Sequence, residues 1–263
     1  TDTLADLASL DDPDFRPQPE PIAIGELADD VVQRFAAIAQ QAEVTLDVDY
    51  PDGLPLTRAD AALVEMLGKP IDQCHALCIP TAQWGHPMCG PTSARGFVAG
   101  APGWESMTGL GWASVGLLEL TALPTVGAER WEPWVREADV LLVDGGEATY
   151  LCHWMRESGL ADLLPSLTDT VWVGVSAGSM VMTPRIGSDF VAWPQASDDR
   201  TLGVVDFSIF PHLDFFPTST LAHAERWAAE IGVPAYAIDE QTAIKVVDGA
   251  TEVVSEGNWQ RFG

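Results

Sequence analysis

The sequence predicts an α/β fold, with a mostly parallel sheet covered by helices on both faces and a β-hairpin near the C-terminus. Three observations support this prediction. Short β-rich runs alternate with helical stretches, the runs are apolar throughout, and the last two are joined by Asp248-Gly249, a hairpin turn signal. The length of 263 residues and the hydrophobic content of 47% are sufficient for a globular core.

The N-terminal part differs from the rest of the chain. Residues 1–25 are expected to form an acidic, flexible or loosely docked arm, with six acidic residues and three prolines between Asp2 and Glu20. Residues 26–56 are expected to form a helix from Glu26 and a strand over residues 44–50, VTLDVDY, in which apolar side chains alternate. A second helix is expected over residues 57–68, where a glycine stops it.

The remaining domain, residues 57–263, contains the regular alternation. The expected strands are residues 76–81, 113–120, 139–144, 171–176, 204–210, 235–239, 243–248 and 251–255. Helical stretches separate most of the first five strands, notably ATYLCHWMRESGLADLLPSL at residues 148–167. Strands separated by helices indicate a parallel sheet, and the last two strands form the hairpin at its edge.

The charge excludes two classes of partner. The formal net charge is −26, and only two of the 13 basic residues are lysines. Such a surface repels nucleic acid and anionic membranes, so neither is an expected partner, although a halophilic source and an ordinary acidic protein would share this charge. No apolar run approaches the ~20 residues that span a bilayer, and no signal peptide is recognisable, so a cytoplasmic location is expected.

No metal or cofactor is predicted. The four cysteines do not form a disulfide framework and are expected to be reduced. Cys74, Cys78 and Cys89 lie near His75 and His86, but their spacing matches no paired C-x-x-C site, and Cys78 lies inside an apolar run.

A candidate nucleophile lies in VWVGVSAGSMVM, residues 171–182. Gly174-Val175-Ser176-Ala177-Gly178 fits the pattern G-x-S-x-G at a transition from strand to helix, which is the context that this motif requires. The glycines would let the backbone turn tightly, and the following helix would direct N–H groups at an oxyanion. An ordinary βα turn is the alternative, but the flanking elements favour a nucleophilic Ser176.

A serine nucleophile needs a base, and His212 is the candidate. It follows the expected strand 204–210, at the edge of the sheet where α/β active sites collect, whereas His153 lies within a helix. A carboxylate should orient the histidine. We expect Asp189, which gives the chain order Ser, Asp, His, but the neighbouring acids leave alternatives: Asp198, Asp199, Asp206 and Asp214.

A second oxyanion donor is expected at Gly145-Gly146, where the strand 139–144 gives way to a helix. Glycine N–H groups are unhindered, and the turn should lie beside Ser176 on the neighbouring strand. A glycine pair at a βα turn is weak evidence alone, and its expected position gives it meaning.

Taken together, DVLLVDGGEATYLCHWMRESGL, VWVGVSAGSMVM and IFPHLDFF resemble the dipeptidase E and cyanophycinase-like family of serine peptidases, over residues 60–263. The resemblance implies a sandwich related to the glutamine amidotransferase (flavodoxin-like) fold, a nucleophile at Ser176, a base at His212 and oxyanion donors at Gly146 and Ala177. It also implies short peptide substrates, those with an N-terminal aspartate among them, held by an arginine for which Arg226 is the candidate. A solvated helix residue is the alternative reading of Arg226.

The chain departs from the family pattern at several places. Asp144 and Glu147 replace a glycine and an asparagine, and Ser179 replaces an alanine. An aspartyl substrate would be opposed by the overall charge unless Arg226 or Arg185 compensates. Residues 26–56 resemble the segment of sensor histidine kinases that precedes the ATP-binding domain, but they contain no histidine. We hypothesise that residues 44–50 supply the first strand of the sheet.

The sequence thus predicts a serine peptidase that acts on short peptides through an acyl-enzyme and needs no cofactor. Two alternatives stay open. The same machinery would allow an esterase or amidase acting on another small acyl compound. A non-catalytic binding or scaffold protein would instead use the N-terminal segments for a partner, and a homodimer is compatible with those segments.

Overall fold

A computed structural model describes residues 58–100 and 107–263 of the chain, all within one compact unit, Leu56–Gly263. The expected arm at residues 1–25, and the helix and strand expected within residues 26–56, lie outside the described residues. The boundary between the expected domains therefore stays a prediction.

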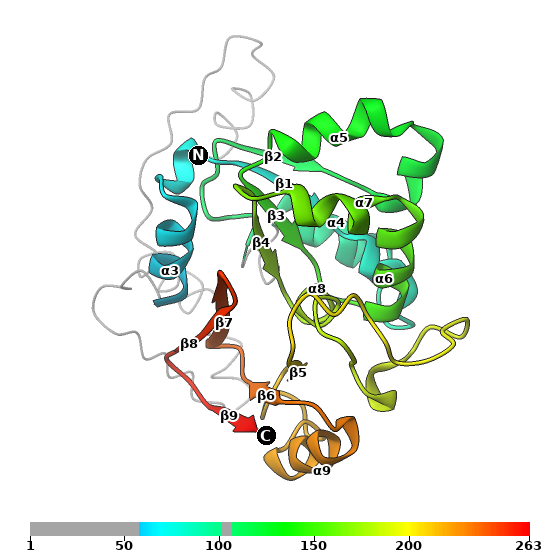
Figure 1. Ribbon diagram of the computed structural model, residues 1–263, viewed down its shortest axis with the longest axis vertical. Coiled ribbons are helices and arrows are strands. Elements are labelled where there is room, and N and C mark those ends of the chain that lie inside the picture. The colour runs from blue at the N-terminus through cyan, green and yellow to red at the C-terminus, as the bar shows by residue number, and fades with distance from the viewer. Residues whose placement is uncertain (1–57, 101–106) are drawn as a thin grey trace, which may run out of the picture. The chain divides into compact units, whose positions relative to one another are not determined.

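A parallel four-stranded sheet contains the predicted nucleophile strand (Figure 1). Its spatial order is β2 (Ser114–Leu117), β1 (His75–Ile79), β3 (Val140–Val143), β4 (Val171–Gly174). The register pairs Ile79 with Val143 and Val143 with Gly174, so these strands end together at their carboxyl ends. The predicted parallel α/β sheet is confirmed.

Both faces of this sheet are buried, because side chains of β3 alternate between two apolar clusters. Leu141 and Val143 join one cluster, and Val140 and Leu142 join the other. The first cluster includes residues of α5 (Ala128–Arg136), α6 (Ala148–Glu157), α7 (Leu160–Leu163) and α8 (Ala177–Met180). The second includes residues of α3 (Arg58–Leu67) and α4 (Pro91–Ala99). Helices therefore cover the two faces, as predicted.

Short 3₁₀ turns complete the helical part at Ile71–Gln73, Thr81–Gly85, Leu120–Thr125, Leu164–Ser166 and Ser188–Phe190. The helical stretch expected over residues 148–167 is divided, because Gly159 takes φ 85° between α6 and α7. Within the described ranges, no helix is long and apolar enough to cross a membrane.

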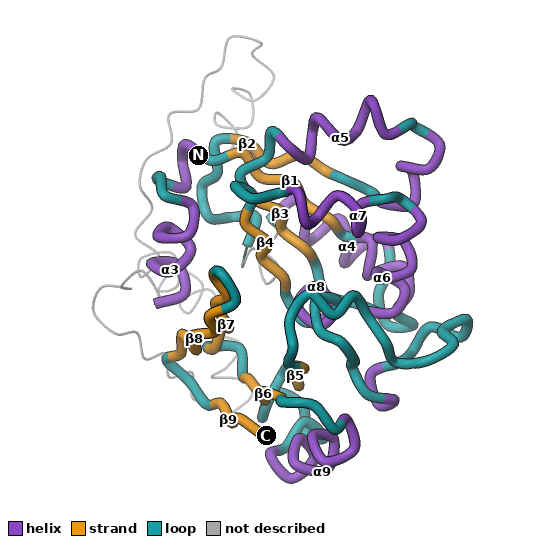
Figure 2. The backbone as a smooth tube through the Cα atoms, in the orientation of Figure 1, coloured by secondary structure: helices purple, strands orange, loops and turns teal. Residues whose placement is uncertain are grey.

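The C-terminal part forms two smaller sheets (Figure 2). In the first, β6 (Ala235–Ile238) lies between β5 (Ser208–Phe210), which is parallel to it, and β9 (Trp259–Phe262), which is antiparallel. The second is the predicted hairpin of β7 (Thr242–Val247) and β8 (Ala250–Ser255), which forms a separate two-stranded sheet instead of the expected edge of the parallel sheet. Its turn residues Asp248 and Gly249 have φ of 51° and 77°, as a two-residue type I′ turn requires.

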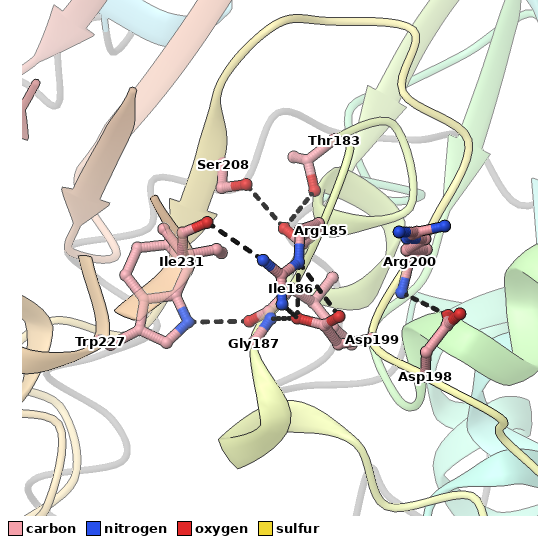
Figure 3. A network of polar contacts seen from close by, with 10 residues as sticks. All are labelled: Thr183, Arg185, Ile186, Gly187, Asp198, Asp199, Arg200, Ser208, Trp227 and Ile231. Atoms are coloured by element: carbon pink, nitrogen blue, oxygen red, sulfur yellow. Dashed lines mark hydrogen bonds and ion pairs between the residues drawn. The ribbon is translucent and has the colours of Figure 1, made fainter. Parts of the chain in front are cut away.

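Arg185 joins the segment after α8 to the C-terminal part of the fold (Figure 3). Its guanidinium donates to both carboxylate oxygens of Asp199 at 3.1 Å and to the carbonyl oxygen of Ile231, the last residue of α9 (Leu221–Ile231). The hydroxyl of Ser208 on β5 donates to the carbonyl oxygen of Arg185 at 2.6 Å. These bonds fix the segment after the nucleophile against β5 and α9.

Candidate active site

Ser176 lies at the sharp turn between β4 and α8, as predicted. Its backbone angles, φ 50° and ψ −113°, lie in a region that residues with a Cβ rarely adopt, at a cost of about 1–3 kcal/mol. Hydrogen bonds on both sides hold the turn: Val175 N–H donates to the Val143 carbonyl, and Gly178 N–H donates to the Val175 carbonyl. The geometry is that of a nucleophile elbow.

The two glycines of the motif are required by close backbone approaches. A Cβ on Gly174 would overlap the Gly178 carbonyl, and a Cβ on Gly178 would overlap the Val143 carbonyl. Neither obstacle is a flexible side chain that could move aside. These close approaches explain why both positions of the motif are glycine.

His212 lies within hydrogen-bond distance of the serine. Its Nε2 is 2.9 Å from Ser176 Oγ, although 36 residues separate them and they follow strands of different sheets. The histidine comes two residues after β5, and its backbone also has a positive φ, 61°. The next residue, Leu213, donates its N–H to the Ile238 carbonyl at the end of β6, which anchors the histidine to that strand. The structure thus brings the predicted nucleophile and base together.

Glu240 supplies the carboxylate that is hydrogen-bonded to His212. Its Oε1 lies 2.6 Å from His212 Nδ1, so the two imidazole nitrogens face Ser176 and Glu240. Glu240 follows β6, and its side chain is 47% exposed. Glu240 is not among the acids predicted for this role, which lie between Ser176 and His212 or two residues after His212. The available signal was its position just after the expected strand 235–239, because active-site groups of α/β folds collect where strands end.

Asp189 does not take the position expected for it. Its Oδ2 lies 2.9 Å from Nε2 of His223, on α9, and it forms no hydrogen bond with His212. The chain order Ser, Asp, His was therefore a wrong guide to the histidine's partner. Asp189 belongs to the 3₁₀ turn Ser188–Phe190, which lies next to α9. The segment before this turn is held there because Trp227 Nε1 of α9 donates to the Ile186 carbonyl.

The Gly145-Gly146 turn lies beside the serine, as predicted. A Cβ built on Gly145 would be 3.2 Å from Ser176 Cβ and 3.8 Å from Ser176 Oγ. Gly146 has φ 134°, and a side chain there would overlap the backbone of Ala82, so only glycine fits. Across the part of the chain that is described, the N–H groups of Gly146 and Ala177 have no hydrogen-bond acceptor.

Asp144, the first departure from the family pattern, is buried directly before this turn at 6% exposure. Its Oδ1 accepts the Gly145 N–H, and its Oδ2 accepts from Gln83 Nε2, both at 2.7 Å. Gln83 in turn accepts the Ser93 hydroxyl at 2.6 Å. Burial raises the pKa of the Asp144 carboxyl to about 6, against the opposing effect of these two hydrogen bonds.

Glu147 and Ser179, the other departures, also have partners. Glu147 is the N-cap of α6 and accepts from Thr149 Oγ1, from the Tyr150 N–H and from the Ala192 N–H. The Ser179 hydroxyl donates to the Gly174 carbonyl at 2.5 Å. Glu147 therefore caps α6, and Ser179 bridges the turn that contains Ser176.

The two candidate arginines form no hydrogen bond or ion pair with Ser176, His212 or Glu240. Arg226 is exposed on α9 and donates to the Ala222 carbonyl of its own helix. Arg185 is held by Asp199 (Figure 3) and lines a cavity of about 580 Å³ that includes neither Ser176 nor His212. A substrate-binding role for Arg226 stays a prediction.

The cysteine-rich segment does not form a metal site among the described residues, where no group of three or more potential ligands is found. His86 Nδ1 lies 3.6 Å from Cys89 Sγ, whereas the His75 ring pairs with the hydroxyl of Ser114. Cys78 is fully buried, and burial raises the pKa of its thiol to about 12, as expected for a buried apolar side chain.

The chain is similar in sequence to known peptidases. A model of peptidase family S51 matches residues 106–254. An uncharacterized peptidase of Pasteurella multocida (strain Pm70) is 27% identical over 125 residues, which cover 44% of this chain and 59% of that protein. The match therefore spans less than two thirds of that relative.

Two solved structures share the fold. A candidate peptidase E protein from Listeria monocytogenes EGD-e has a TM-score of 0.56 and 19% identity, over 75% of this chain and 93% of its own. A peptidase from an acI-B1 Actinobacterium has a TM-score of 0.54 and 18% identity, over 82% and 91% of the two chains.

The family match begins at residue 106, so the resemblance of residues 26–56 to a histidine kinase is unsupported. The dipeptidase E and cyanophycinase-like resemblance, in contrast, is confirmed over more than half of the chain. This chain therefore belongs to peptidase family S51, a family of serine peptidases.

Proposed function

We propose that this protein hydrolyses short peptides through an acyl-enzyme, with Ser176 as nucleophile and His212 as general base. The observation that carries the proposal is the 2.9 Å separation of Ser176 Oγ and His212 Nε2 at a strained strand-to-helix turn. A serine hydroxyl is a poor nucleophile unless a base lies at such a distance. This contact argues against a purely structural or scaffold role.

Glu240 is the orienting group in this proposal, in place of Asp189. A carboxylate at 2.6 Å from Nδ1 fixes the tautomer that leaves Nε2 as acceptor for the serine proton, and it stabilises the imidazolium that follows. The backbone N–H groups of Gly146 and Ala177 are the proposed oxyanion donors. Both lack a hydrogen-bond acceptor within the described segments, and Gly146 belongs to the turn that contacts Ser176.

The reaction takes two steps. His212 takes the proton of Ser176 as Oγ bonds to the peptide carbonyl carbon, and it returns that proton to the leaving amine as the C–N bond breaks. Water then attacks the ester with His212 again as base, so that the acid product leaves and Ser176 regains its proton.

Short peptides are the proposed substrates, and those with an N-terminal aspartate are included only through the family resemblance. Arg226 would have to leave its hydrogen bond with the Ala222 carbonyl to bind such an aspartate. A panel of dipeptides with aspartate, alanine or lysine as the first residue, assayed beside simple esters, tests the substrate class directly.

The catalytic assignment is tested with Ser176→Ala and with labelling by a fluorophosphonate. The variant should lose peptide hydrolysis by a factor of about 10⁴ or more and should no longer be labelled, while its thermal unfolding stays that of the wild type. Ser188→Ala is the matched control, because this exposed serine makes no side-chain hydrogen bond within the described ranges. Hydrolysis at the wild-type rate by Ser176→Ala would refute the proposal.

A further inference from the structure

Two large aromatic side chains next to the site are exposed although the loop that carries them is well ordered by hydrogen bonds. Phe215 and Phe216 follow His212 by three and four residues and are 62% and 48% exposed. Exposed phenylalanines in neighbouring positions form an apolar patch of the kind that marks binding surfaces.

The loop is fixed by its own hydrogen bonds. Phe215 N–H donates to the His212 carbonyl at 3.1 Å, and Asp214 N–H donates to the Ser219 carbonyl at 2.8 Å. The buried Ser219 accepts the Phe216 N–H at its hydroxyl, 2.9 Å away. Asp214 also has a positive φ, 63°. The rings are therefore held in place by a strained, hydrogen-bonded turn and do not belong to a loose tail.

Both rings contact the imidazole of His212. The centroid of the Phe216 ring lies 5.5 Å from that of the imidazole, and the Phe215 centroid lies 6.1 Å from it. The two phenyl rings are perpendicular to each other at 4.8 Å. Since Ser176 and Glu240 occupy the two ring nitrogens, the phenyl rings must border the rest of the imidazole surface.

The phenyl rings lie where the leaving side of the scissile bond would approach His212. The leaving nitrogen has to come within about 3 Å of His212 Nε2 to receive its proton. The Cβ of the residue carrying that nitrogen is only roughly 2.5 Å further away, given ordinary bond lengths. The side chain of the leaving residue therefore starts within reach of groups that border the imidazole.

From these observations we infer that Phe215 and Phe216 form an apolar subsite for the side chain of the leaving residue, and that the enzyme prefers peptides with a large apolar residue there. The inference rests on the proposed function. Asp214 lies in the same loop and Glu240 is hydrogen-bonded to His212, so an acidic leaving residue is disfavoured.

The test compares matched peptides that differ only in the leaving residue: Asp-Phe with Asp-Gly, and Ala-Phe with Ala-Gly. For the wild type, kcat/KM should be about 10 to 100 times higher for the phenylalanine peptide of each pair. In Phe215→Ala/Phe216→Ala this ratio should fall about tenfold, because kcat/KM falls more for the phenylalanine peptide than for the glycine peptide. Trp134→Ala, which removes a 44% exposed aromatic side chain on α5, is the matched control and should leave the ratio unchanged.

The ratio separates a binding role from a structural one. If the rings only positioned His212, the double variant would lose kcat on both peptides of a pair equally, and the inference would be wrong. An altered preference for the acyl residue, with Phe-Gly compared with Ala-Gly, would also overturn it. Fluorophosphonate labelling of Ser176 in parallel distinguishes the two proposals, because a wild type that neither reacts nor hydrolyses any peptide contradicts the proposed function itself.

Discussion

Replacing Asp144 by asparagine should stabilise the protein at neutral pH, because the buried carboxylate is costly to ionise. Burial raises the pKa of Asp144 from 3.8 to about 6. At about 1.4 kcal/mol for each pH unit, this corresponds to a cost of about 3 kcal/mol in the free energy of unfolding at pH 7. Asparagine avoids the cost and keeps the acceptor for the Gly145 N–H, and the Gln83 amide can reverse to accept from it.

The direction of the stability change follows from the pH at which the folded and the unfolded chain each release the Asp144 proton. Below pH 3.8 the carboxyl is protonated in both states, so ionisation of Asp144 costs nothing. Between pH 3.8 and about 6 the unfolded chain releases the proton while the folded chain keeps it, so the stability of the wild type falls as the pH rises. Above pH 6 the cost is constant. The advantage of Asp144→Asn should therefore grow across this interval and then level off.

Urea unfolding at pH 4, 5, 6 and 7, followed by tryptophan fluorescence, measures this difference. The difference between variant and wild type should increase by about 2.4 kcal/mol from pH 4 to pH 7, because about 0.6 kcal/mol of the cost is already present at pH 4. Asp162→Asn, on the exposed side of α7, controls for the loss of one negative charge from a protein with net charge −26. A difference that stays constant within about 0.5 kcal/mol would refute the reasoning, since the burial cost would then be absent.

Three further predictions concern the site and its supports. Glu240→Gln should lower kcat by about 10² to 10⁴, whereas Asp189→Asn should change it less than about threefold, and the reverse result in steady-state assays would restore the aspartate as the orienting group. Gly178→Ala should cost more than about 3 kcal/mol in urea unfolding, because its Cβ meets a backbone carbonyl, and an unchanged midpoint would contradict the close approach. Asp199→Ala should lower the free energy of unfolding by about 1–3 kcal/mol, because Arg185 and the Gly187 N–H lose the carboxylate that accepts from them. An unaltered melting temperature would show that these hydrogen bonds contribute little to stability.

The local parts of the site could be predicted because a few adjacent residues determine them. The turn at Ser176 needs glycine on both sides and a strand and a helix around it, all of which lie within 12 residues of sequence. The same is true of the Asp248-Gly249 turn. His212 was found because the carboxyl ends of strands gather catalytic groups, which is a rule about one residue and its own strand.

The third member of the site could not be predicted in the same way. Glu240 meets His212 only because β5 and β6 are parallel neighbours, and the sequence does not say which strands pair. Acidic residues are also so frequent in this chain that every loop near the histidine offered a candidate. The strand β9 was not predicted, because three of its four residues are exposed and it lacks the apolar pattern of a buried strand.

The proposed catalytic groups belong to different sheets, since Ser176 follows a strand of the four-stranded sheet and both His212 and Glu240 follow strands of the three-stranded one. Partial unfolding that separates these sheets would abolish peptide hydrolysis, while most of the secondary structure persists. On heating, peptide hydrolysis should therefore be lost before the circular dichroism signal. The rate of peptide hydrolysis then reports whether the C-terminal part is packed against the four-stranded sheet.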